Sequence, residues 1–101
     1  DKEFTSEELS QYDGSDPSKP IYISVKRIVY DISSKSDFYK KGKLHNILVG
    51  KDSSRALAIT SLNKDDARPE YEDLNDDELN MLNRWEKFFQ KKYPVVGRLV
   101  L

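Results

Sequence analysis

The chain has 101 residues, of which 37% are hydrophobic and 35% charged, and its formal net charge is −1. This length suits one domain, residues 1–101, with a modest core. The near-neutral charge argues against a nucleic-acid-binding protein, and the absence of cysteine excludes disulfides, zinc–thiolate sites and a cysteine nucleophile. No apolar run is long enough to span a bilayer, so we expect membrane contact only through a segment absent from this chain.

The first predicted element is a short helix that follows Phe4. Thr5 is a suitable N-cap, Glu8 completes a capping box three residues later, and Phe4 can pack on Leu9 as a hydrophobic staple. The turn residues of DGSDPSKP are expected to end this helix before Pro20.

Residues 21–32, IYISVKRIVYDI, are rich in β-branched and aromatic side chains and predict a β-hairpin that turns at Lys26 and Arg27. Tight hairpin turns favour Asn or Gly, where φ is positive. We therefore expect some strain in this turn.

The next stretch, residues 38–57, contains the only histidine of the chain. Phe38 and Tyr39 are expected to begin a turn of helix or a tight loop. His45 and Leu48 would share an apolar face if their segment is helical. A further helix follows Gly50, capped within residues 52–54 and running through residues 55–58.

The strongest predicted helix starts at the N-cap Asn75, where Glu78 completes a second capping box, and Pro94 stops it. Residues 95–101 predict a final short strand. Strands and helices mix without regular alternation, which indicates an α+β domain: a small mixed sheet with short helices that form a ligand cleft to one side.

Five lysines lie near His45 in the sequence: Lys35, Lys40, Lys41, Lys43 and Lys51. They form either a solvated face or part of a site. No nucleophile elbow supports a Ser-His-Asp triad, and the segment from Gly50 to Ser53 lacks the leading glycine of a phosphate loop. One histidine without cysteine makes a zinc site improbable. Haem differs, because a single strong axial ligand can hold its iron.

Several segments together resemble the membrane-associated progesterone receptor family of cytochrome b5-like haem/steroid-binding domains. They cover nearly the whole chain: FTSEELSQYDG, PIYISVKRIVYDIS, FY, VGKDSSRAL and LNRWEKFFQKKYPVVGRLV. The most specific piece is GKDSSR, residues 50–55. Within the family, His45-Asn46 followed by GKDSSR resembles the neudesin branch.

The resemblance implies a cytochrome b5-like fold and, in typical members, haem b bound between helices. Counting from Tyr39 and back from Gly50 places His45 at the position of the family's iron-ligand tyrosine. Tyr39, Lys92 and Tyr93 match positions that support this ligand or the haem edge. The expected cofactor-binding residues are therefore Tyr39, His45, Lys92 and Tyr93, with His45 on the metal.

The chain departs from the family pattern at three places. His45 replaces the ligand tyrosine, residues 40–44 replace a glycine- and proline-rich loop, and Arg27 replaces a glycine. An imidazole is a good iron ligand, but it is shorter than a tyrosine side chain. The lysines of the loop could pair with propionates or lie beside a cleft that is open to water.

Two functional hypotheses follow. The first is a non-enzymatic haem-binding domain, and the second is a b5-like interaction or signalling module that has lost haem and contacts a protein partner through its cleft face. A steroid or lipid ligand rests on the family resemblance alone. The same resemblance gives the expected location, which is the endoplasmic reticulum membrane or the secretory route.

Overall fold

A four-stranded mixed sheet forms the centre of the protein in the computed structural model, which describes residues 2–101. Its strand order is β1-β4-β3-β2, with bounds β1 Lys2–Phe4, β2 Tyr22–Val25, β3 Ile28–Asp31 and β4 Val95–Leu99. β1 pairs in parallel with β4, and the other neighbours are antiparallel. The predicted hairpin and final strand are confirmed, although the final strand ends two residues early. β1 was not predicted, because three residues are too short for a periodic signal.

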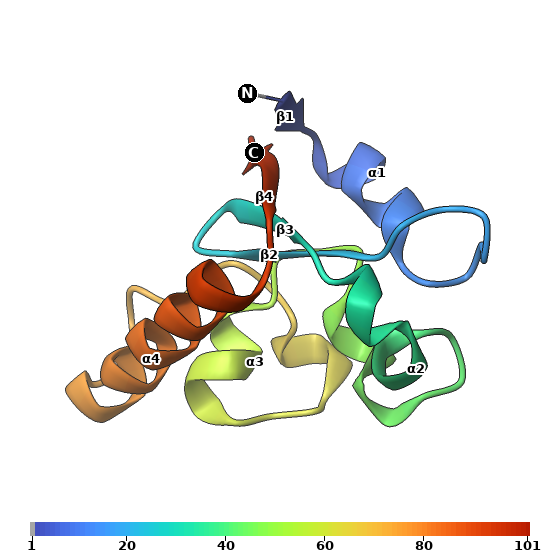
Figure 1. Ribbon diagram of the computed structural model, residues 1–101. Helices are drawn as coiled ribbons and strands as arrows, with labels where there is room; N and C mark the ends of the chain where they lie inside the picture. Colours follow the sequence, from blue (N-terminus) through green and yellow to red (C-terminus); the bar gives the residue numbers. More distant parts are fainter. Residues whose placement is uncertain (1) are drawn as a thin grey trace.

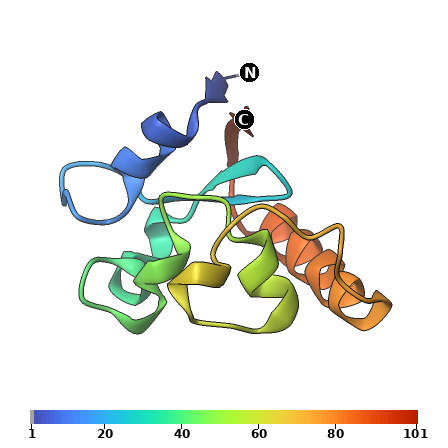
Figure 2. The ribbon, with the colours of Figure 1, turned by 180° about the vertical axis from the view of Figure 1, so that it is seen from behind.

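The helices lie on both sides of this sheet (Figure 1). Their bounds are α1 Ser6–Leu9, α2 Ser36–Tyr39, α3 Ser54–Ile59 and α4 Asp76–Lys92, with 3₁₀-helices at Ser10–Tyr12, Ser33–Lys35, Leu44–Leu48 and Lys64–Asp66. α2, α3 and α4 gather on one side, whereas α1 lies toward the two termini, and the reverse view shows the same division (Figure 2). The predicted α+β architecture, a small mixed sheet with short helices, is confirmed, and α2, α3 and α4 are the helices that gather to one side.

Apolar side chains pack on both faces of the sheet. The larger core cluster includes Ile23 and Tyr30 from the sheet together with Leu57 of α3 and Phe89 of α4. A smaller cluster contains Phe4, Leu9, Val29 and Leu99. The larger cluster anchors α3 and α4 against the sheet, and this packing fixes the positions of both helices.

Two predicted capping boxes are present. The Thr5 hydroxyl accepts from the Glu8 amide while the Glu8 carboxylate accepts from the Thr5 amide, and Asn75 and Glu78 make the same reciprocal pair. Each box satisfies backbone donors that a helix start leaves without intrahelical partners. These bonds are local, which is why the sequence predicted both helix starts correctly.

The hairpin turn adopts the backbone that its sequence disfavours. Lys26 and Arg27 have φ values of 49° and 67°, in the left-handed region that non-glycine residues seldom occupy. The buried carboxylate of Asp52 accepts from the Arg27 amide at 2.9 Å, and the hydroxyl of Ser54 accepts from the Lys26 amide at 2.7 Å. These bonds from a distant segment help to hold the expected strained turn in place.

Candidate functional site

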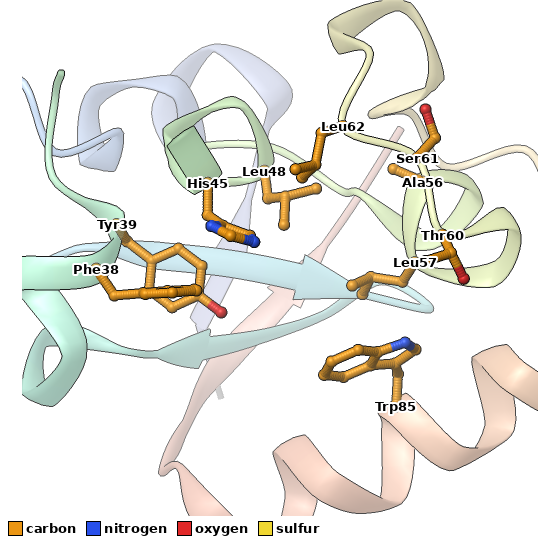
Figure 3. A pocket seen from close by; sticks show the side chains of 10 residues that line it. All are labelled: Phe38, Tyr39, His45, Leu48, Ala56, Leu57, Thr60, Ser61, Leu62 and Trp85. Carbon is orange, nitrogen blue, oxygen red and sulfur yellow. The ribbon is translucent and has the colours of Figure 1, made fainter. Parts of the chain in front are cut away.

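A cavity of about 250 Å³ opens among α2, α3, α4 and the 3₁₀-helix Leu44–Leu48. Figure 3 shows its walls, with Phe38 and Tyr39 on one side, Leu57 opposite, and Trp85 reaching in from α4. The lining is mainly apolar, and its polar members are few. It comprises Phe38, Tyr39, His45, Leu48, Ala56, Leu57, Thr60, Ser61, Leu62 and Trp85.

A second cavity of about 300 Å³ adjoins the first and shares Phe38, Tyr39 and Trp85 with it. Its other lining residues are Lys35, Phe88, Lys92 and Tyr93. We call the two cavities together the cleft. The four residues that the sequence proposed for cofactor binding therefore all line one cleft, although they come from two distant parts of the chain: Tyr39, His45, Lys92 and Tyr93.

His45 is half-buried and points into the cleft beside the aromatic residues of α2 (Figure 3). Its ring stacks on Phe38, with centroids 4.1 Å apart and planes inclined by 24°, and meets Tyr39 edge-on at 6.4 Å. A stacked neighbour covers the face of an imidazole, whereas the lone pair that binds a metal lies in the ring plane. The stacking therefore orients His45 without using its ligating electron pair.

The segment around His45 is a 3₁₀-helix rather than an α-helix. The side-chain amide of Asn46 donates to the carbonyls of Asp13 and Tyr39, each at 2.8 Å. The hydroxyl of Ser53 donates to the Leu48 carbonyl at 2.7 Å. His45 and Leu48 line the same cavity, as the apolar spacing predicted, and these side-chain bonds tie the segment to the rest of the fold.

Burial raises the pKa values of the two tyrosines in the cleft, Tyr39 and Tyr93. It raises the pKa of Tyr39 to about 12, with a smaller contribution from nearby Tyr93, and it also raises the pKa of Tyr93. A phenol loses solvation of its charged form when it is buried, so the protonated form is favoured. Both hydroxyls are therefore protonated at neutral pH and able to donate a hydrogen bond.

Two lysines of the second cavity supply positive charge. Within residues 2–101, neither Lys35 nor Lys92 forms an ion pair. The Lys92 ammonium lies 5.8 Å from the centre of the Phe88 ring. Both cations are thus available to an anionic group at this end of the cleft.

The GKDSSR motif lies within the fold rather than on the cleft surface. Asp52 accepts from the Ser24 hydroxyl at 2.6 Å, from the Arg27 amide at 2.9 Å and from the Ser54 amide at 2.9 Å. Asp52 and not Ser53 satisfies the amide at the start of α3. Arg55 makes two hydrogen bonds to Asp73. The motif joins the hairpin, the His45 segment and α3 into one scaffold.

Comparison with known proteins identifies the family. The model of the "Cytochrome b5-like Heme/Steroid binding domain" matches residues 5–100. The chain belongs to this family. It is 50% identical over 97% of its length to "Probable steroid-binding protein 3" of Arabidopsis thaliana, covering 98% of that protein. A solved Arabidopsis structure described as having a cytochrome b5 like fold superposes with a TM-score of 0.89 at 49% identity, covering 99% of this chain and 92% of the other.

The predicted membership of the membrane-associated progesterone receptor branch is also confirmed. The chain is 39% identical over 98% of its length to human "Membrane-associated progesterone receptor component 2" and 43% identical over 94% to Arabidopsis "Membrane steroid-binding protein 1". It spans 45% and 43% of those two proteins. Their names associate both with membranes, while no helix among residues 2–101 has the length and apolarity to cross one. The neudesin-like placement stays a prediction.

Sequence reasoning missed part of this b5-like cleft. Trp85 has the helical spacing of a core residue, but it is half-buried and lines both cavities while also packing on the core. Leu57 and Leu62 had no signal that separated them from ordinary packing residues. The succession of Trp85, Phe88 and Phe89 on a single helix was a usable hint, because so wide an aromatic surface cannot all face one core.

The cleft residues fit haem b. No group of three or more His, Asp or Glu side chains among residues 2–101 could enclose a free metal ion. Haem needs less, because the porphyrin supplies most of the ligands and the protein adds an axial donor. His45 offers such a donor on an apolar wall, and Lys35 and Lys92 offer cations at the adjoining end.

Proposed function

We propose that this domain binds haem b in the cleft and that His45 is the axial ligand of the iron. The observation that carries the proposal is the position of the only imidazole of the chain on the wall of the mainly apolar cleft, oriented by Phe38. A ligand cleft that is mostly apolar, with a few placed polar groups, is typical of cofactor sites. Membership of the heme/steroid binding domain family supports the same class of ligand.

Each of the other predicted residues has a distinct task in this proposal. Tyr39, held protonated by burial, donates a hydrogen bond beside His45. Tyr93 borders the second cavity, where Lys35 and Lys92 would pair with the propionates of a bound haem. The lysines of residues 40–43 add positive charge near the same face. Bound haem would supply a redox-active iron, whose ferrous state is favoured more by a neutral imidazole than by a phenolate.

A hemin titration followed by visible absorbance tests the proposal. We expect a Soret band with the unaltered protein and its loss with His45→Ala, whereas Tyr39→Phe should retain the band because it keeps both the ligand and the ring. Far-ultraviolet circular dichroism of each variant checks folding. No Soret shift with micromolar unaltered protein would overturn the proposal.

The interaction module without haem is the alternative from the sequence. This alternative predicts a colourless protein in which His45→Ala changes neither folding nor partner binding. Steroid binding is a second ligand possibility that the mainly apolar lining supports, since most cleft residues offer only van der Waals contact. Displacement of a fluorescent steroid from the unaltered protein, measured without hemin, separates it from both hypotheses. Non-enzymatic action and a location at the endoplasmic reticulum or in the secretory route remain predictions.

A further inference from the structure

Exposed apolar side chains are concentrated around the mouth of the cleft. Phe38, Leu62 and Phe88 line the cavities while remaining more than 40% exposed, and Leu44, adjacent to His45, is 69% exposed. Isolated exposed apolar residues are ordinary, but several around one opening mark an interaction surface. We call these four residues the apolar rim.

The two segments that form walls of the cleft carry an excess of positive charge. The segment 35–45, which forms one wall, has four lysines and one aspartate, and the segment 84–92, which forms another, has four cations and one glutamate. The whole chain is nevertheless slightly negative, with a net charge of −1. Of these cations, Lys35 and Lys92 line the second cavity of the cleft itself.

The acidic residues near the rim do not cancel this charge. Asp37 lies 3.6 Å from Lys40, and Glu86 pairs at 3.1 Å with Lys26 of the hairpin turn. Beyond Leu62, Asp66 accepts a hydrogen bond from Ser61, and its neighbour Asp65 lies beside Lys64 in the chain. Lys35, Lys41, Lys43, Lys91 and Lys92 form no ion pair among the described residues.

We propose that the apolar rim and its lysines dock on the surface of an anionic bilayer, so that the cleft opens toward the lipid. Apolar side chains enter the headgroup region while lysines bind acidic lipids, a combination that gives reversible surface attachment. A ligand of low water solubility could then pass between bilayer and cleft without crossing water. This attachment does not require haem or His45.

Charge favours a lipid surface over a second copy of the chain. A symmetric dimer through this face would set each lysine cluster against an equivalent cluster, because a two-fold interface pairs the same patch on both subunits. An anionic bilayer instead offers an extended surface of opposite charge. A dimer, or a protein partner in place of lipid, is therefore an outcome that would overturn the proposal.

Co-sedimentation of the ligand-free protein with vesicles tests this surface. We expect binding to vesicles of phosphatidylcholine and phosphatidylserine at equal weight and little binding to pure phosphatidylcholine. The paired change Lys35→Glu with Lys92→Glu, at the two lysines that line the cleft, should weaken binding more than about tenfold, since each lysine near an anionic surface contributes about 1 kcal/mol. Leu44→Ser should weaken it several-fold.

Matched variants at the opposite end of the molecule serve as controls. The exposed fraction of Leu101, 64%, is similar to the 69% of Leu44. Leu101→Ser should nevertheless bind vesicles like the unaltered protein, and so should Lys2→Glu. Absence of binding to the anionic vesicles, equal loss in the control variants, or a concentration-dependent dimer that Leu44→Ser abolishes would each overturn the proposal. Because no hemin is present, these results are separate from the Soret test.

Discussion

The GKDSSR segment, residues 50–55, and the His45 segment, residues 38–45, lie close together in the chain but differ in how they are held. The first is mostly buried, and the carboxylate of Asp52 is fully engaged by neighbouring donors. The second is more exposed, and its rings stack on one another beside a loop in which Gly42 has open space around it. The motif most specific to the family therefore builds the scaffold, whereas ligand chemistry is carried by the less constrained segment.

The sharpest test of this contrast is Asp52→Ala. It leaves the Ser24 hydroxyl and the Arg27 and Ser54 amides without their acceptor, so we expect a loss of about 3 kcal/mol or more in the free energy of unfolding. Urea denaturation measures it. Asp37→Ala, at a side chain 98% exposed, should change stability by less than about 0.5 kcal/mol. Equal effects at both sites would remove the distinction.

Two glycines with positive φ provide a matched pair. An added Cβ at Gly50 would lie 2.6 Å from the Asp13 Cβ, whereas one at Gly42 would meet nothing within 4 Å. Backbone strain alone should cost Gly42→Ala about 1 kcal/mol, and the clash should bring Gly50→Ala to about 3 kcal/mol. Thermal or urea unfolding of both variants tests the difference, which similar losses would contradict.

The buried hydroxyl of Tyr39 predicts an alkaline loss of stability. Its pKa is raised from 10.0 to about 12 in the folded protein, so above pH 10 the unfolded chain loses this proton first. The contribution is complete below pH 10 and is lost as the pH rises to about 12, by at most about 3 kcal/mol. Urea unfolding at a series of pH values should show a shallower decline for Tyr39→Phe. Identical profiles would contradict burial of this hydroxyl.

The smallest effect is expected at the hairpin turn and has the opposite sign. Arg27 has a φ of 67°, so Arg27→Gly should stabilise the protein by about 0.5 to 1 kcal/mol through relief of strain. Arg27→Ala keeps the Cβ and should give no such gain. A loss of stability in the glycine variant would indicate that the arginine side chain contributes more than its backbone strain costs.

Much of the fold was predictable because its signals are local. The capping boxes at Thr5 and Asn75 depend on residues three positions apart, and the β-branched and aromatic residues on both sides of residues 26–27 predicted the hairpin. β1 was not predictable from its own three residues. It exists because residues 2–4 meet β4 at the far end of the chain, which no short sequence window can show.

For the site, the sequence determined which residues to consider, and the tertiary structure determined their surroundings. The family resemblance selected Tyr39, His45, Lys92 and Tyr93, and the fold brings them to adjoining cavities. Only packing decided that Phe38 stacks on His45 and that Trp85 faces the cleft. Local hydrogen bonds and periodicity depend on residues that are close together in the sequence. A cleft, in contrast, forms from surfaces that meet only after the chain has folded.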